Sequence, residues 1–316
     1  MRLTARLPGW CNATVRPAAL PRSVCAVLAS AFALSSCGQD VEVSPAPPRE
    51  ARPVSAPPAG GTARRDPLKS RPAGVRRMTI TVDSAGSDDV RYSAPSSVRG
   101  GLVEITLRND SAAPYKAQLW RITGSHSVQE ALRVRHPQPD WLRTAGGVSL
   151  TAPGATSRTL QALPAGRYYV ANTLGAPGDV ARFEVTGPTA TDPPRAPARV
   201  EALDFSFRVS GLRAGRNSVD FDNTGTQPHH AFFAPLRDGA DIAEVRRFFG
   251  ETTSTGPPPV LSDGTRETVV LEGGDRQVTE LNLAAGRYAL ICFVRGREGG
   301  KPHIELGMIN EVRVPR

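Results

Sequence analysis

Beyond residue 77 the chain alternates short apolar-rich runs with turn-forming residues. The runs "GLVEITLRN" (101–109) and "NSVDFDN" (217–223) alternate apolar and polar positions, which is typical of strands with one buried face. The runs "RYYVANT" (167–173) and "RYALICFV" (287–294) are more continuously apolar and contain aromatic and β-branched residues. Glycine, proline, asparagine and aspartate separate these runs. The pattern predicts an all-β protein built of Greek-key β-sandwiches.

The two halves of this region repeat each other. An ungapped alignment of "VEITLRNDSAAPYKAQLW" with "NSVDFDNTGTQPHHAFFA" matches Asn109 with Asn223, Pro114 with Pro228, and Ala117 with Ala231. Further along, "LPAGRYYVANT" and "LAAGRYALICF" share leucine, glycine, arginine and tyrosine, and each half has one short helical segment between the matched stretches, at 128–134 and 242–249. Two matched stretches in the same order indicate a duplication.

The duplication predicts two tandem domains. We place the first at 78–187 and the second at 200–316, each long enough to have its own core. A proline- and alanine-rich stretch, which we place at 188–199, has the composition of a linker between them.

The N-terminus has the features of an export signal at 1–36. Arginines precede the apolar run "SVCAVLASAFALSSC", which is too short to span a bilayer. Its last four residues, Leu-Ser-Ser-Cys, resemble a bacterial lipobox, and this resemblance implies cleavage before Cys37 and lipid on its sulfur. We therefore expect an exported membrane lipoprotein that faces the periplasm or the cell exterior. An ordinary signal peptide with an incidental cysteine is the alternative.

Residues 37–77 are rich in proline, alanine and arginine, so we expect a disordered tether between the lipid and the folded part. The net charge of +9 comes almost entirely from arginine, since the chain has only three lysines, and many of these arginines lie in the tether. No nucleic-acid-binding motif accompanies the charge, so we expect no nucleic-acid partner.

The cysteine count is informative. Of the four cysteines, Cys11 and Cys25 leave with the signal and Cys37 would carry lipid, so Cys292 is the single thiol of the mature chain. A lone cysteine in an exported protein is either a buried apolar side chain, a reactive group or a metal ligand.

The differences between the halves point to the chemistry. Where the second half has His229 and His230, the first has Tyr115 and Lys116, and Asn172 stands at the position of Cys292. The strand ends that carry these residues can be neighbours in a Greek-key sandwich, and a loop containing His303 and Met308 follows Cys292. Two imidazoles, a thiolate and a weak thioether are the ligand set of a blue-copper electron-transfer site.

In these motifs the second half resembles the cupredoxin family, with "NTGTQPH", "YALIC", "KPH" and "LGM" in the family's order. The resemblance implies copper ligands at His229, Cys292, His303 and Met308. We prefer His229 to His230 because family ligands commonly follow the turn as Pro-His; if His229 points inward, His230 points to the opposite face. The ten residues between Cys292 and His303 make a long, glycine-rich loop for this family.

The function that follows is electron transfer through one type 1 copper site, with an exposed edge of His303 as the electron port by family resemblance. The sequence does not identify the redox partner. Non-redox copper sequestration or delivery, and a metal-free binding module, are the alternatives. We expect no enzyme, because a second copper centre needs more histidines than the five present and Ile291 and Phe293 flank Cys292. Motifs of hydrolytic enzymes are also absent from the sequence.

Overall fold

The structure is a computed structural model in which the described residues are 66–70, 72–84, 90–171, 180–188, 192–250 and 256–316. The predicted signal peptide, Cys37 and most of the predicted tether lie outside them. The described chain consists mainly of strands arranged in sheets, which confirms the prediction of an all-β fold. In this part of the chain, no helix is both long and apolar enough to cross a bilayer.

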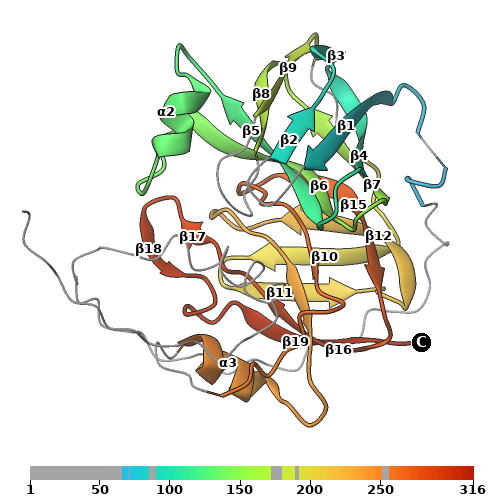
Figure 1. The fold of residues 1–316 in the computed structure, drawn as a ribbon, viewed down its shortest axis with the longest axis vertical. Helices are drawn as coiled ribbons and strands as arrows, with labels where there is room; N and C mark the ends of the chain where they lie inside the picture. The colour runs from blue at the N-terminus through green and yellow to red at the C-terminus, as the bar shows by residue number, and fades with distance from the viewer. Residues whose placement is uncertain (1–65, 71, 85–89, 172–179, 189–191, 251–255) are drawn as a thin grey trace, which may run out of the picture.

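The first half is a sandwich of two sheets (Figure 1). One sheet surface has the strand order β2-β1-β4-β7, with bounds β1 (Arg76–Ser84), β2 (Val90–Ser93), β4 (Gly101–Asn109) and β7 (Thr156–Leu163). The facing sheet has the order β3-β9-β8-β5-β6, with bounds β3 (Ser97–Arg99), β5 (Tyr115–Ile122), β6 (Leu142–Thr151), β8 (Gly166–Ala171) and β9 (Ala181–Thr186). Helix α2 (Val128–Arg133) follows β5 and begins at a capping box formed by Ser127 and Glu130.

The second half repeats this arrangement. One surface has the order β11-β10-β12-β15, with bounds β10 (Ala198–Leu203), β11 (Ser206–Ser210), β12 (Gly215–Asn223) and β15 (Arg276–Leu283). The facing sheet has the order β14-β13-β16-β19, with bounds β13 (Phe232–Pro235), β14 (Arg266–Glu267), β16 (Gly286–Ile291) and β19 (Ile309–Val314). Helix α3 (Ile242–Gly250) follows β13, and a hairpin of β17 (Arg295–Gly296) and β18 (Gly299–Pro302) lies between β16 and β19.

Residues that the two halves share in sequence form equivalent hydrogen bonds in both halves. The side-chain amide of Asn109 donates to the backbone oxygens of Ala113 and Thr151, and that of Asn223 donates to Gln227 and Leu271 in the same way. These amides close the turns that follow β4 and β12, and they join each turn to the segment opposite. Tyr168 and Tyr288 likewise each donate a hydroxyl hydrogen bond to the backbone oxygen four residues earlier.

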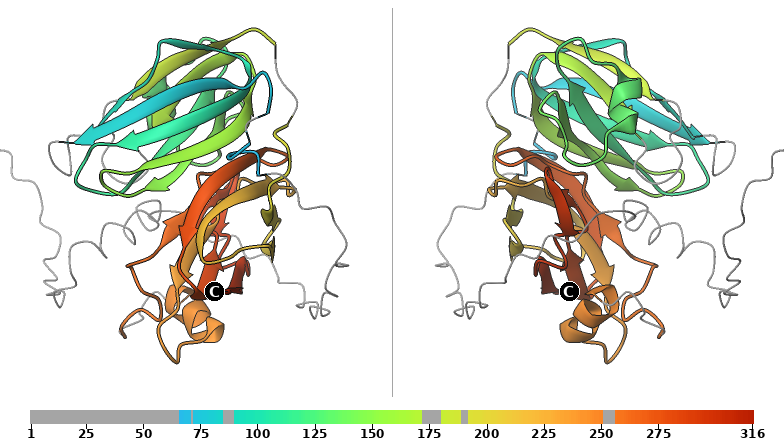
Figure 2. Two further views of the ribbon diagram at one scale, coloured as in Figure 1. Left: turned by 90° about the vertical axis from the view of Figure 1, so that its right-hand side faces the viewer. Right: turned by 90° about the vertical axis from the view of Figure 1, so that its left-hand side faces the viewer.

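The two halves are joined through their sheets. Strand β7 of the first half pairs with β15 of the second, so that β11-β10-β12-β15-β7-β4-β1-β2 is one eight-stranded sheet. Figure 2 shows the resulting pair of lobes, with the strands of the second half continuing below those of the first. Buried hydroxyls add to the junction, because Thr279 bonds to Thr159 at 2.9 Å and to Ser149 at 2.7 Å. The junction is therefore a hydrogen-bonded part of the fold.

Part of the predicted tether belongs to the folded structure. Strand β1 starts at Arg76, and Leu68, which falls in the predicted disordered tether, is buried against Leu160, Ala196 and Val278. This cluster lies beside the β7–β15 junction, since Leu160 and Val278 are paired there. Residues 66–70 are thus part of the folded molecule, because a nearby apolar site between the halves accepts the leucine.

The turn-closing asparagines lead to a stability prediction. We expect Asn109→Ala to lower the free energy of unfolding by about 1–3 kcal/mol, because two buried backbone oxygens lose their donor. Urea unfolding followed by far-UV circular dichroism measures this change. Asn282→Ala removes the same group from an exposed strand position and is the control. Equal midpoints for the two variants would show that the amide of Asn109 does not hold the turn.

Candidate metal centre

The sheet that contains β13 and β16 brings the candidate ligands together. These strands are antiparallel neighbours, with Phe232 opposite Ile291. His229 lies just before β13 and Cys292 lies just after β16, so both are at the same end of the sheet. His303 follows β18, and its backbone N–H bonds to the oxygen of Val294, which brings the chain back to that end.

Three donor atoms from these residues form a compact triangle. The Cys292 Sγ lies 3.7 Å from His229 Nδ1 and 3.5 Å from His303 Nδ1, and the two Nδ1 atoms are 3.0 Å apart. A triangle with these sides has its centre about 2 Å from each corner, which is the length of a metal–imidazole bond and close to that of a metal–thiolate bond. The side chains therefore fit a metal ion without rearrangement. We call these three residues the His–Cys–His cluster.

The orientation of His229 is set by a carboxylate outside the cluster. Its Nε2 donates to Asp204 Oδ1 at 3.1 Å, which leaves the lone pair of Nδ1 directed at Cys292 and His303. Asp204 lies in the turn between β10 and β11 and also accepts hydrogen bonds from the backbone of Thr226 and Gln227. Gly225 allows this approach, because a Cβ there would lie 2.3 Å from Asp204 Oδ1. Burial alone would raise the pKa of Asp204, but hydrogen bonds from the Thr226 hydroxyl, the Gln227 backbone and His229 lower it to about 2.

Burial decides the protonation of the cluster itself. Desolvation lowers the pKa of His229 and lowers that of His303 to about 3, so both imidazoles are neutral at pH 7 and able to bind a metal. Desolvation also raises the pKa of the Cys292 thiol to about 12, with backbone hydrogen bonds at His230 and Val294 acting in the opposite direction. A metal that binds here must displace the thiol proton. Cys292 forms no disulfide within the described residues.

His303 is buried, which corrects the expectation of an exposed imidazole edge. The residue is 1% exposed, and among the described residues its Nε2 has no hydrogen-bond partner. The ring of Phe205 packs edge-on against the imidazole at a centroid distance of 5.2 Å and is itself partly exposed. Phe205 has a φ of 65°, a backbone conformation that few non-glycine residues adopt. The turn that contains Asp204, the hydrogen-bond partner of His229, therefore also covers His303 through Phe205.

Met308 is joined to His303 and Cys292 through backbone hydrogen bonds. It is fully buried and belongs to the same hydrophobic core as Cys292. Its backbone N–H bonds to the oxygen of His303 at 2.9 Å, and its oxygen accepts from Cys292 N at 3.2 Å. The six residues from His303 to Met308 thus return the chain to the backbone of Cys292.

His230 is turned away from the cluster. Its Nδ1 donates to Glu267 at 2.9 Å, and its Nε2 accepts from the backbone N–H of Phe293 at 2.9 Å. Glu267 also contacts Lys116, the residue of the first half that matches His230 in the sequence repeat. Burial would raise the pKa of Glu267, but the charge of Lys116 and the hydrogen bond from His230 lower it to about 2. His230 therefore connects the backbone beside Cys292 to the first half.

The comparisons with known proteins give only distant likenesses. No known family and no curated protein matches the chain. Among solved structures, auracyanin B is 23% identical over 37% of this chain and 86% of its own, with a TM-score of 0.24. A multicopper oxidase is 15% identical over 76% of this chain and 89% of its own, with a TM-score of 0.21. A copper-containing nitrite reductase from Thermus scotoductus is 13% identical over 77% of this chain and 62% of its own, with a TM-score of 0.20.

These comparisons contradict one expectation from the sequence. The chain was expected not to be an enzyme, whereas the solved structures that it resembles include multicopper oxidases, a laccase and a nitrite reductase, which are enzymes. The expectation counted histidines in the sequence, and such a count does not exclude these neighbours. The likeness is to the fold.

Several residues that shape the centre were not singled out in the sequence. Asp204 and Phe205 lie in a short turn between β10 and the edge strand β11, and Glu267 lies in a two-residue strand. Nothing in their local pattern distinguishes them from surface residues. Asp204 and Glu267 are recognisable only by their hydrogen bonds to His229 and His230. These bonds form only in the tertiary structure.

The two adjacent histidines should respond differently to substitution. We expect His230→Ala to lower the free energy of unfolding of the metal-free protein by about 1–3 kcal/mol, because Glu267 and the Phe293 N–H lose a buried partner. Urea unfolding measures the change, and the partly exposed His126 provides the control variant His126→Ala. Metal affinity, followed by competition with a chelator, should fall much further in His229→Ala than in His230→Ala. The opposite order would assign the ligand role to His230.

Proposed function

We propose that this protein binds one copper ion in a type 1 site and transfers electrons through it. In this proposal His229, Cys292 and His303 would hold the ion, and the thioether of Met308 would be a further, weak ligand. The observation that carries it is the buried triangle of two imidazole nitrogens and one thiol sulfur, whose centre is about 2 Å from each donor. Imidazole, thiolate and thioether together are the donor set of blue-copper electron-transfer sites.

The residues around the cluster perform the supporting tasks. Copper bound in such a site supplies a one-electron couple. Asp204 keeps His229 in the tautomer whose Nδ1 faces the centre. The strands β13 and β16 fix the spacing of His229 and Cys292, and the buried surroundings exclude water from the thiolate. Ligands that are already placed need little rearrangement between two oxidation states.

The covered imidazole changes where an electron would enter. His303 has almost no contact with solvent, whereas Phe205 contacts its ring and is partly exposed. We place the electron entry, and the docking of a partner redox protein, at the face that carries Phe205. Copper sequestration or delivery is the second candidate, since donors buried to this extent favour retention of the ion. A metal-free binding module is the third.

The test of this proposal is the visible and EPR spectrum with Cu²⁺. We expect the chain from residue 38 onward to develop an intense blue thiolate-to-copper band, with Cys292→Ser as the control that lacks it. The small hyperfine coupling of a type 1 site should accompany the band. Tight binding without the band would assign the protein to copper storage or delivery. Absence of binding would leave only the metal-free module.

Export and lipid attachment are part of the same proposal. They rest on the sequence of the apolar run that ends in Leu-Ser-Ser-Cys at Cys37, which lies outside the described residues. A lipid at this position would hold the protein at the outer face of a bacterial membrane, with residues 38–65 between the lipid and the folded part. The copper site would then meet its redox partners outside the cytoplasm.

Membrane fractionation in a bacterial host tests the lipid. We expect the full chain in the membrane fraction after a salt wash, and Cys37→Ser in the soluble fraction. Cys25→Ser changes a cysteine inside the apolar run and should remain with the membrane. A Cys37→Ser variant that stays membrane-bound would exclude lipid on this sulfur as the means of attachment.

A further inference from the structure

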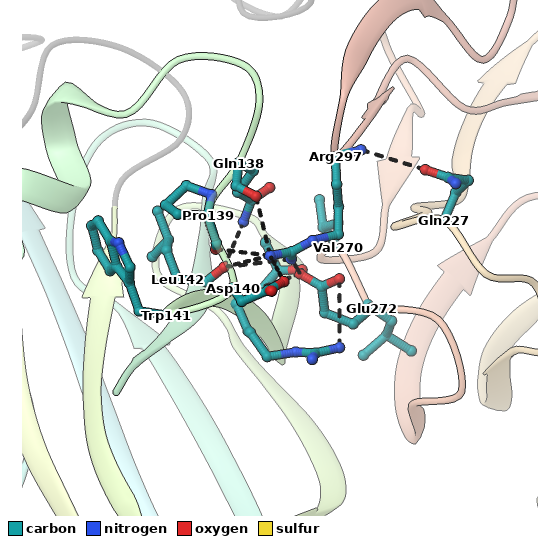
Figure 3. Close-up of polar contacts among 12 residues, drawn as sticks. Gln138, Pro139, Asp140, Trp141, Leu142, Gln227, Val270, Glu272 and Arg297 are labelled. Carbon is teal, nitrogen blue, oxygen red and sulfur yellow. Dashed lines mark hydrogen bonds and ion pairs between the residues drawn. The ribbon is translucent and has the colours of Figure 1, made fainter. Parts of the chain in front are cut away.

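The long segment between Cys292 and His303 is fastened to the first half of the chain. It forms the β17–β18 hairpin, and Arg297 lies at its turn (Figure 3). The guanidinium donates to Pro139 O at 2.8 Å and to Gln138 O at 3.3 Å, and it contacts Leu142 O at 3.4 Å. It also bonds to the carboxylate of Glu272 at 3.0 Å. The long, glycine-rich loop identified in the sequence is therefore held in place by the first half.

The backbone of Arg297 also takes part in the contact between the hairpin and the first half. The backbone N–H of Gln138 donates to Arg297 O at 2.6 Å, so the main chain and the side chain of Arg297 are both engaged by the 136–142 segment. The hairpin also packs closely there, because a Cβ on Gly299 would lie 2.8 Å from the Cβ of His136. Glycine at this position, with a φ of 90°, allows the two backbones to approach.

A second connection reaches His229 through residues 270–272. Gln118 of β5 accepts from Val270 N at 2.7 Å and donates to Val270 O at 3.1 Å. The next residue, Leu271, forms two backbone hydrogen bonds with His229, each of 2.9 Å, and a β-bridge with Ala145 of the first half. Each histidine of the cluster is thus adjoined by a segment that the first half holds.

Glu272 connects the two routes. Its Oε1 accepts from Arg297, and from the backbone N–H and hydroxyl of Thr144 at 3.0 Å each. The side chain is 1% exposed, so these donors compensate for the burial of its carboxylate, whose other oxygen lies 4.0 Å from Arg143. Without the guanidinium, a buried carboxylate and several carbonyl groups would lose a charged donor, which disfavours the docked hairpin.

We propose that Arg297 is a positioning residue through which the first half of the chain holds His303 in the metal centre. The half without the His–Cys–His cluster is then a structural part of the site. This proposal rests on the proposed function only in one respect, the identity of the metal. The docking of the hairpin is a property of the metal-free protein. Arg297 touches none of the three donor atoms and acts through the hairpin that precedes His303.

The first test measures how well the hairpin shields Cys292 in the metal-free protein. The chain from residue 38 onward contains all described residues and Cys292 as its single cysteine. We expect an aromatic disulfide reagent to react with Cys292 about tenfold faster in Arg297→Ala than in the unchanged protein, because loss of a charged hydrogen bond favours local opening. Arg297→Lys should react at an intermediate rate, since an ammonium cannot bridge the carboxylate and several carbonyls.

Two controls separate local opening from other effects. Lys301→Ala removes the same charge from an exposed position of the same hairpin and should react like the unchanged protein. Asn109→Ala weakens a turn of the first half and reports how a general loss of stability affects the rate. If Asn109→Ala reacts as fast as Arg297→Ala at equal loss of global stability, or if Arg297→Ala reacts no faster than Lys301→Ala, the proposal is overturned.

The second test uses copper. We expect Arg297→Ala to retain a thiolate-to-copper band through Cys292 while its EPR hyperfine coupling and band position change, because His303 is no longer held. Lys301→Ala should keep the spectrum of the unchanged protein. Spectra that are identical for Arg297→Ala and the unchanged protein would overturn the role of Arg297. If no variant binds copper, the proposed function fails, and the thiol rates still decide whether Arg297 positions the hairpin.

Discussion

The pairing of β7 with β15 is the interaction on which the rest of the molecule depends. It joins one sheet of each half into a single eight-stranded sheet. Strand β6 of the first half then lies beside residues 270–272, which precede β15 in the chain. From this placement follow the contacts of Gln118, Thr144 and Arg297 across the junction. A duplicated chain with independent halves would have none of them.

Duplication explains how one half can support the other. Both halves keep the residues that close turns and corners, such as Asn109 and Asn223, because these satisfy buried backbone groups of the common fold. Positions whose side chains satisfy no buried backbone group can differ between the two halves. Lys116 in the first half and His230 in the second are matched in the sequence, and they now meet on the carboxylate of Glu267. Two copies of one position thus face each other across the junction.

The metal centre shows how local geometry and burial act together. The carboxylate of Asp204 orients His229, and Glu267 holds His230 away, so two adjacent histidines have different neighbours. Burial keeps both imidazoles of the cluster neutral and raises the pKa of the thiol. Within the described part of the chain the Nε2 of His303 has no hydrogen-bond partner, and the ring packs against Phe205 and follows the hairpin.

The sequence by itself determined the strands, the duplication and the residues that meet in the cluster. Alternating patterns report which face of a strand is buried, and the order of histidine, cysteine, histidine and methionine reports a ligand set. Only the tertiary structure decided that His229 and not His230 faces Cys292, that His303 is covered, and that the long hairpin is docked. These outcomes depend on Asp204, Phe205 and Arg297, whose partners are distant in the chain. Local periodicity carries no information about such partners, because they are selected by the packing of the two halves.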